Sequence, residues 1–110
     1  MFTVPVLPYD YDALKVAISE DIMRLHHDTH HQTYVDKLNA AITGVPEAEG
    51  RSVEYLLAHI DSLPEAIRGA VRNHGGGHYN HSLFWQWMSP DGGGEPTGEL
   101  AESIVKKYGS

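Results

Sequence analysis

Seven of the eight histidines fall into two short clusters, and imidazole is the side chain best suited to binding a metal ion or moving a proton near neutral pH. The first cluster comprises His26, His27, His30 and His31. The second comprises His74, His78 and His81. A single histidine is most simply a packed or solvated residue. Two clusters of them indicate a shared site that the rest of the chain positions.

The first cluster lies on a predicted helix over residues 20–43, which contain no glycine or proline. Ser19 precedes it as an N-cap, and Gly44 is typical of a helix end. The second cluster follows Ser62-Leu63-Pro64-Glu65, which has capping-box form with Ser62 at the N-cap. Three glycines at 75–77 interrupt this second apolar segment. They form either a loop between two short helices or part of a continuous helix whose backbone approaches another group closely, and we favour the continuous helix.

Helical spacing sorts the first cluster into two rows. His26, His30 and Tyr34 stand four residues apart and share one face. The second row, His27 and His31, is rotated by about 100°. We expect one row to face a partner helix and the other to meet solvent or a subunit interface. The glutamate that zinc metalloproteases carry directly after the first histidine is absent here, which excludes that class.

Composition excludes several other classes. The 110 residues carry a formal charge of −7 and no basic stripe, so nucleic acid and anionic membrane are poor partners. No apolar run is long enough to cross a bilayer, and no export signal is visible. The absence of cysteine excludes thiolate metal ligands and disulfides. We expect a soluble, cytoplasmic protein whose metal ligands would be imidazole, carboxylate or water.

The chain divides near residue 90. Residues 1–90 form the predicted helical-hairpin domain. Residues 91–110 form a glycine- and proline-rich linker and a last helix, which Thr97 begins as a cap. This helix has an apolar face without an evident partner, so it reads as the first helix leading to a C-terminal domain that is absent here.

Four stretches match the pattern of a known family. They are Leu7-Pro8-Tyr9-Asp10-Tyr11-Asp12-Ala13-Leu14, His26-His27-Asp28-Thr29-His30-His31-Gln32-Thr33-Tyr34-Val35, Arg72-Asn73-His74-Gly75-Gly76-Gly77-His78-Tyr79-Asn80-His81-Ser82-Leu83-Phe84-Trp85 and Gly92-Gly93-Gly94-Glu95-Pro96-Thr97-Gly98-Glu99-Leu100. Together they resemble the N-terminal half of the iron/manganese superoxide dismutases, from about residue 3 to the last residue. The two-histidine helix and the Asn80–Trp85 stretch are the most specific of these matches.

The resemblance implies an all-α fold, namely a long antiparallel helical hairpin with a short extra C-terminal helix. It implies His26 and His81 as metal ligands, one from each long helix. It also implies His30 and Tyr34 as catalytic residues along the path of superoxide, which the family dismutates to dioxygen and hydrogen peroxide. Gly77 stands where manganese-type members carry glycine and iron-type members glutamine. Manganese is therefore the expected metal, and iron is the alternative.

The match also has gaps. The family's C-terminal α/β domain supplies two further ligands from an Asp-x-Trp-Glu-His stretch, and in manganese types a glutamine that hydrogen-bonds the coordinated solvent. This sequence contains no such stretch, and Val16 stands where the family commonly has proline. We therefore expect that domain as the natural partner and weak or no dismutase activity from the chain alone.

A second interpretation comes from a different functional class. The chain could be a self-associating helical module, a homo-oligomer in which His26 and His81 of two chains surround one shared metal. The apolar surface left by the absent domain would drive such pairing. The plainest interpretation is a helical domain that binds nothing. Metal stoichiometry and mass in solution distinguish the three.

Overall fold

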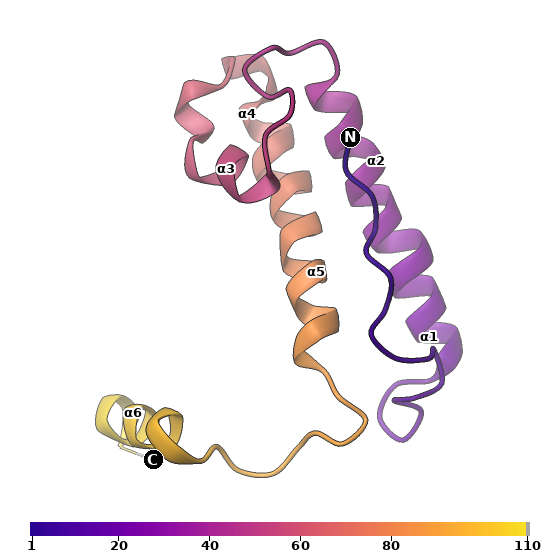
Figure 1. The fold of residues 1–110 in the computed structure, drawn as a ribbon, viewed down its shortest axis with the longest axis vertical. Helices are drawn as coiled ribbons and strands as arrows, with labels where there is room; N and C mark the ends of the chain where they lie inside the picture. The colour runs from indigo at the N-terminus through magenta and orange to yellow at the C-terminus, as the bar shows by residue number, and fades with distance from the viewer. Residues whose placement is uncertain (110) are drawn as a thin grey trace.

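The computed structural model describes residues 1–109, and every regular element among them is helical. Two long arms run antiparallel, side by side (Figure 1). The first arm is continuous through α1 (Glu20–Arg24), the π-helical turn η1 (Leu25–His31) and α2 (Gln32–Ile42). The second is continuous through α4 (Glu65–Ala70), the π-helical turn η3 (Val71–Gly75) and α5 (Gly76–Trp87). The predicted all-α hairpin is confirmed.

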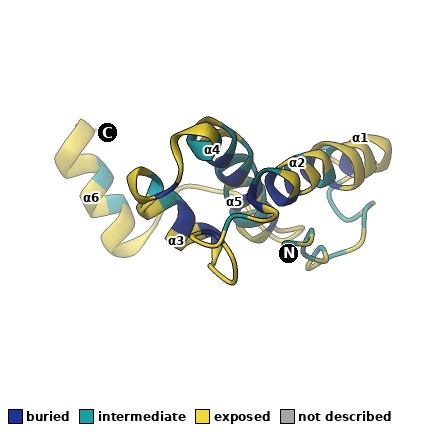
Figure 2. Ribbon diagram, turned by 90° about the horizontal axis from the view of Figure 1, so that it is seen from above, coloured by how far each residue is buried: buried dark blue, intermediate teal, exposed yellow. Residues whose placement is uncertain are grey.

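The hydrophobic core lies at the end of the hairpin where the chain turns back. There α3 (Val53–Ala58) and the 3₁₀ turn η2 (Ile60–Ser62) connect the arms. The core consists of Leu38, Ile42, Ala48, Val53, Leu56, Leu63 and Val71. Burial is concentrated on the facing sides of the helices, while their outer sides are exposed (Figure 2). Aliphatic packing at this end leaves the other half of the hairpin to the histidines.

The helix ends follow the sequence with one exception. Ser19 accepts a hydrogen bond from the Ile22 N–H (3.4 Å), and Gly44 adopts a left-handed φ of 74° after the first arm. Ser62 was expected to cap the second arm, and this is wrong. Its hydroxyl instead donates to the His59 carbonyl (2.6 Å) because the 3₁₀ turn draws it back into the preceding turn. Pro64 occupies the N-cap position without a side-chain cap.

The triple glycine lies inside a continuous helical arm, as predicted, and each arm contains one π-helical turn. The first π turn, η1, contains the whole first histidine cluster, and the second, η3, contains His74. Hydrogen bonds from residue i to i+5 replace the usual i to i+4 pattern in such turns. Residues five apart are thereby brought toward the same face. This change in the direction of the side chains around the helix axis determines which histidines meet across the hairpin.

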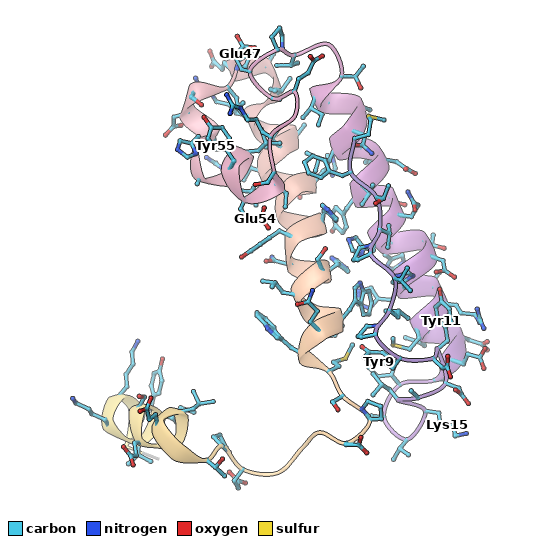
Figure 3. All side chains as sticks on the ribbon, in the orientation of Figure 1. Tyr9, Tyr11, Lys15, Glu47, Glu54 and Tyr55 are labelled. Carbon is cyan, nitrogen blue, oxygen red and sulfur yellow. The ribbon has the colours of Figure 1, made fainter. Side chains whose placement is uncertain are left out.

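An extended N-terminal arm, residues 1–11, lies along the hairpin and forms hydrogen bonds to it (Figure 1). The Phe2 N–H donates to Asn39 Oδ1 (2.7 Å), and the Asn39 amide donates back to the Phe2 carbonyl (2.9 Å). At the other end the Tyr9 hydroxyl donates to the carbonyl of Trp85 on α5 (2.9 Å). Figure 3 shows Tyr9 and Tyr11 at the end of the hairpin where α5 stops. The N-terminal arm therefore contacts both α2 and α5.

The last helix, α6 (Gly98–Tyr108), stands away from the hairpin (Figure 1). Thr97 occupies its N-cap position but makes no capping hydrogen bond. None of its residues is buried, and Leu100 is 63% exposed. No helix within residues 1–109 is long and apolar enough to cross a membrane. The division of the chain near residue 90 stays a prediction.

Truncating one leucine in the core and one on α6 tests this division of packing. We expect Leu56→Ala to lower the free energy of unfolding by about 2–5 kcal/mol, because Leu56 is fully buried. Leu100→Ala should change it by about 0.5 kcal/mol or less. Urea unfolding of both variants measures this. A large loss from Leu100→Ala would show that α6 packs against protein in solution.

Candidate metal centre

Two half-buried imidazoles, one from each arm, meet edge to face. His26 Nε2 lies 2.9 Å from His81 Nε2, with the ring planes 89° apart. The other nitrogen of His81, Nδ1, lies 2.7 Å from the Gly77 carbonyl. A carbonyl can only accept, so Nδ1 carries the proton and Nε2 of the neutral ring keeps a free lone pair. His26 Nε2–H donates to that lone pair.

This pair can share one cation. A ligating imidazole nitrogen lies about 2.1 Å from a zinc-sized ion, and two such nitrogens at a right angle are about 3.0 Å apart. The 2.9 Å separation would allow both nitrogens to bind one cation, which would displace the proton that His26 carries on Nε2. No group of three or more potential ligands is arranged around an ion site within residues 1–109. The part of the chain described here thus offers two candidate ligands.

A cleft of about 510 Å³ opens beside the pair. Its lining residues are His26, His30, Thr33, Tyr34, Lys37, Asn73, His74 and His81. The His30 ring centroid lies 5.9 Å from that of His26, and the Tyr34 centroid lies 5.2 Å from that of His81. The structure therefore brings all four predicted site residues to one cleft. His30 is exposed within it and Tyr34 is half-buried.

Sequence reasoning singled out His74 only as a member of its cluster, and it missed three residues of the lining: Thr33, Lys37 and Asn73. The signal for two of them was present. His30, Thr33, Tyr34 and Lys37 follow the i, i+3, i+4, i+7 spacing of one helix face. Lys37 is the important omission, because it places a positive charge at a cleft that no carboxylate lines. The chain as a whole carries −7.

One histidine row was expected to face a partner helix and the other to meet solvent or a subunit interface, and this separation is wrong, because members of both rows lie against α5. His31 is fully buried and His27 is buried as well. The His31 ring stacks on His81, with centroids 5.2 Å apart and planes at 30°. The π turn η1 is the reason, since its i to i+5 pattern turns His31 toward the same partner as His26. His27 instead faces the N-terminal arm and donates from Nε2 to the Pro5 carbonyl (2.8 Å).

Burial keeps the central imidazoles neutral. It is the main cause that lowers the pKa of His31 from 6.5 to about 3, and repulsion from His78, His81 and His27 contributes to the same shift. Burial is also the main cause that lowers the pKa of His26, followed by repulsion from His81 and His30. Neutral imidazole is the form that binds metal ions. Burial thus favours the neutral form of His26 and His31, and His26 can bind a metal ion through Nε2 once the proton on that nitrogen has left.

Comparison with known proteins identifies the family. Residues 1–89 match the iron/manganese superoxide dismutase alpha-hairpin domain. The chain belongs to the iron/manganese superoxide dismutase family. The resemblance stated from the motifs is confirmed.

Curated relatives in this family are named as manganese enzymes. Superoxide dismutase [Mn] of Pseudomonas putida is 58% identical over 107 residues, which are 97% of this chain and 52% of the relative. Superoxide dismutase [Mn] of Listeria innocua is 54% identical over 109 residues, 99% of this chain and 54% of the relative. Superoxide dismutase [Mn] 3 of Leptolyngbya boryana is 51% identical over 97% of this chain and 45% of the relative. The chain spans about half the length of these superoxide dismutases.

In this member of the superoxide dismutase family, the Tyr34 ring packs directly against Gly77. A Cβ atom at position 77 would overlap the Tyr34 ring. The neighbouring Gly76 is also helical, but a Cβ atom there would meet nothing within 4 Å. Gly77 is therefore the glycine that provides the close approach expected from the sequence.

Alanine at these two positions gives a matched test. Gly76→Ala should stabilise the fold by about 0.5–1 kcal/mol, because it only improves helix propensity. Gly77→Ala should destabilise it by about 1–3 kcal/mol through overpacking and displace the Tyr34 ring. Urea unfolding and the aromatic NMR signals of Tyr34 measure the two effects. Equal stability of the two variants, with Tyr34 unmoved, would contradict this account.

Proposed function

We propose that the chain supplies the histidine half of a superoxide dismutase centre, with His26 and His81 as ligands of manganese and iron as the alternative metal. The observation that carries the proposal is the 2.9 Å Nε2–Nε2 pair at a cleft without carboxylates. The manganese superoxide dismutases among its relatives support it. The reaction is the dismutation of superoxide to dioxygen and hydrogen peroxide.

The metal centre would supply one-electron exchange with superoxide when bound. The chain's own residues hold it and handle protons. The Gly77 carbonyl keeps the proton of His81 on Nδ1, so Nε2 is available to the metal. Tyr34 and His30 line the same cleft and carry exchangeable protons, and peroxide formation consumes two of them. We assign these two residues the catalytic role of delivering protons to the reduced oxygen species.

The charge distribution around the cleft favours an anionic substrate. Superoxide carries one negative charge, and the chain's formal charge of −7 would repel it at long range. The cleft lining contains Lys37 and several histidines but no aspartate or glutamate. A locally positive cleft in a negative protein can still raise the local concentration of an anion.

The remaining ligands must come from outside residues 1–109. Imidazole suits iron, whereas manganese prefers oxygen ligands, so two imidazoles do not by themselves select manganese. A carboxylate from the C-terminal domain expected from the family would add the kind of oxygen ligand that manganese prefers. That domain is the natural partner we propose. The cytoplasmic location stays a prediction.

A chimera tests this function. The chain is joined to the C-terminal part of the Pseudomonas putida relative that the match leaves uncovered. We expect the chimera to retain manganese after desalting and to dismutate superoxide. His26→Ala or His81→Ala should abolish both, because each removes one of the two ligands. His59→Ala, outside both clusters, is the control. A folded chimera that is fully active with His26→Ala would contradict the proposal.

One observation favours the self-associating module as a second candidate. A hollow of about 370 Å³ borders the same pair, and Phe84 and Trp87 line it. Trp87 is 75% exposed, which is unusual for so large an apolar side chain. A second copy of the hairpin placed there would bring four imidazoles around one metal. We propose this homo-oligomer only for the chain without a C-terminal partner.

Mass in solution and elemental analysis decide this second candidate. A shared site requires an even-numbered oligomer holding about half a metal ion per chain after loading with manganese and desalting. Trp87→Ser should convert it to monomer and release the metal. A wild-type monomer without retained manganese would rule out the shared site and leave the half-site function standing.

A further inference from the structure

A chain of buried hydrogen bonds crosses the hairpin behind the ligand pair. The indole N–H of Trp85 donates to His31 Nδ1 (3.0 Å). His31 Nε2 lies 2.8 Å from His78 Nδ1. Trp85 and His78 both belong to α5, while His31 belongs to the opposite arm. All three side chains are buried.

The indole of Trp85 determines which ring nitrogen carries the proton in each histidine of this hydrogen-bonded series. An indole nitrogen can only donate, so His31 Nδ1 must be unprotonated. The proton of neutral His31 is then on Nε2, which donates to His78 Nδ1. His78 in turn carries its own proton on Nε2. The order Trp85 to His31 to His78 is therefore directional, and reversing it would oppose two donors.

The hydrogen-bonded ring of His31 contacts His81, one of the two proposed metal ligands. His31 stacks on His81, which lies between His78 and Trp85 along α5. Hydrogen bonds at both ring nitrogens fix the position of His31, so it provides a rigid surface for one side of the His81 ring. His78 itself does not line the cleft.

We propose that His78 is a positioning residue for the metal centre: it locks His31, and His31 holds the His81 ring in the orientation that directs Nε2 at His26. The role assigned to His78 rests on the proposed function, whereas the hydrogen-bonded geometry around it does not. The hydrogen-bonded chain spans both arms, so it also sets the register in which the two ligands meet.

Two substitutions at one position separate hydrogen bonding from packing. His78→Leu keeps most of the volume but leaves the buried His31 N–H without an acceptor. His78→Asn is the conservative rescue, because its carbonyl oxygen can accept that hydrogen bond. Trp85→Phe removes the donor at the other end and serves if His78→Leu fails to fold. Leu56→Ala is the control for lost stability, since it lies in the aliphatic core.

The first measurement is zinc affinity of the full chain, because imidazole suits zinc and the probe does not depend on manganese chemistry. Loss of zinc binding in His26→Ala identifies the pair as the site. We expect His78→Leu and Trp85→Phe to weaken zinc binding by about 10- to 100-fold, and His78→Asn and Leu56→Ala to bind like the wild type. Wild-type affinity in a folded His78→Leu variant would overturn the proposal.

The second measurement is nitrogen-15 NMR of the histidine rings in metal-free chain. We expect His31 protonated at Nε2 and His81 at Nδ1 in the wild type, with the His81 signals shifted in His78→Leu and restored in His78→Asn. Wild-type His31 protonated at Nδ1, or His81 signals unchanged in His78→Leu, would overturn the proposal. If the wild type binds no zinc, two imidazoles are too few to hold the ion without the C-terminal domain; the chimera then tests the proposed function, and these spectra alone decide the role of His78.

Discussion

One backbone carbonyl, that of Gly77, determines which nitrogen of His81 faces its partner. Because this oxygen can only accept, it holds the ring proton on Nδ1 and leaves Nε2 as a lone pair. The same residue must lack a side chain, since Tyr34 lies directly over it. Three successive glycines cost roughly 1 kcal/mol each in a helix. Here the cost of the last of the three, Gly77, accompanies a fixed proton position on His81 and the close packing of the Tyr34 ring.

The two π turns supply the rest of the geometry. In a regular α-helix, residues five apart point about 140° away from each other, so His26 and His31 could not both contact one ring on α5. The π turn η1 removes that conflict, and His81 is contacted by both. Such turns are often found at functional sites. In this hairpin the turn converts two predicted rows of histidines into one layered cluster.

The helices and most of their ends were readable from the sequence because they follow local rules. Ser19 as a cap and Gly44 as a stop depend on neighbouring residues alone. The sequence did not reveal that His31 is buried, because its burial depends on packing between distant segments. Nor did it reveal that the Ser62 hydroxyl donates to the His59 carbonyl instead of capping the next helix. Lys37 could have been found from spacing. The pairing of His26 with His81 came from family resemblance and not from periodicity.

The contacts that build the site join residues far apart in the chain. His26 and His81 are separated by 55 positions, and Tyr9 and Trp85 by 76. Local helices form quickly, whereas contacts of high sequence separation must wait for the intervening chain. During synthesis the first four histidines therefore emerge from the ribosome well before their partners exist. The His26–His81 pair is complete only once α5 has emerged, so a metal ion at the proposed site would bind after translation of the hairpin rather than during it.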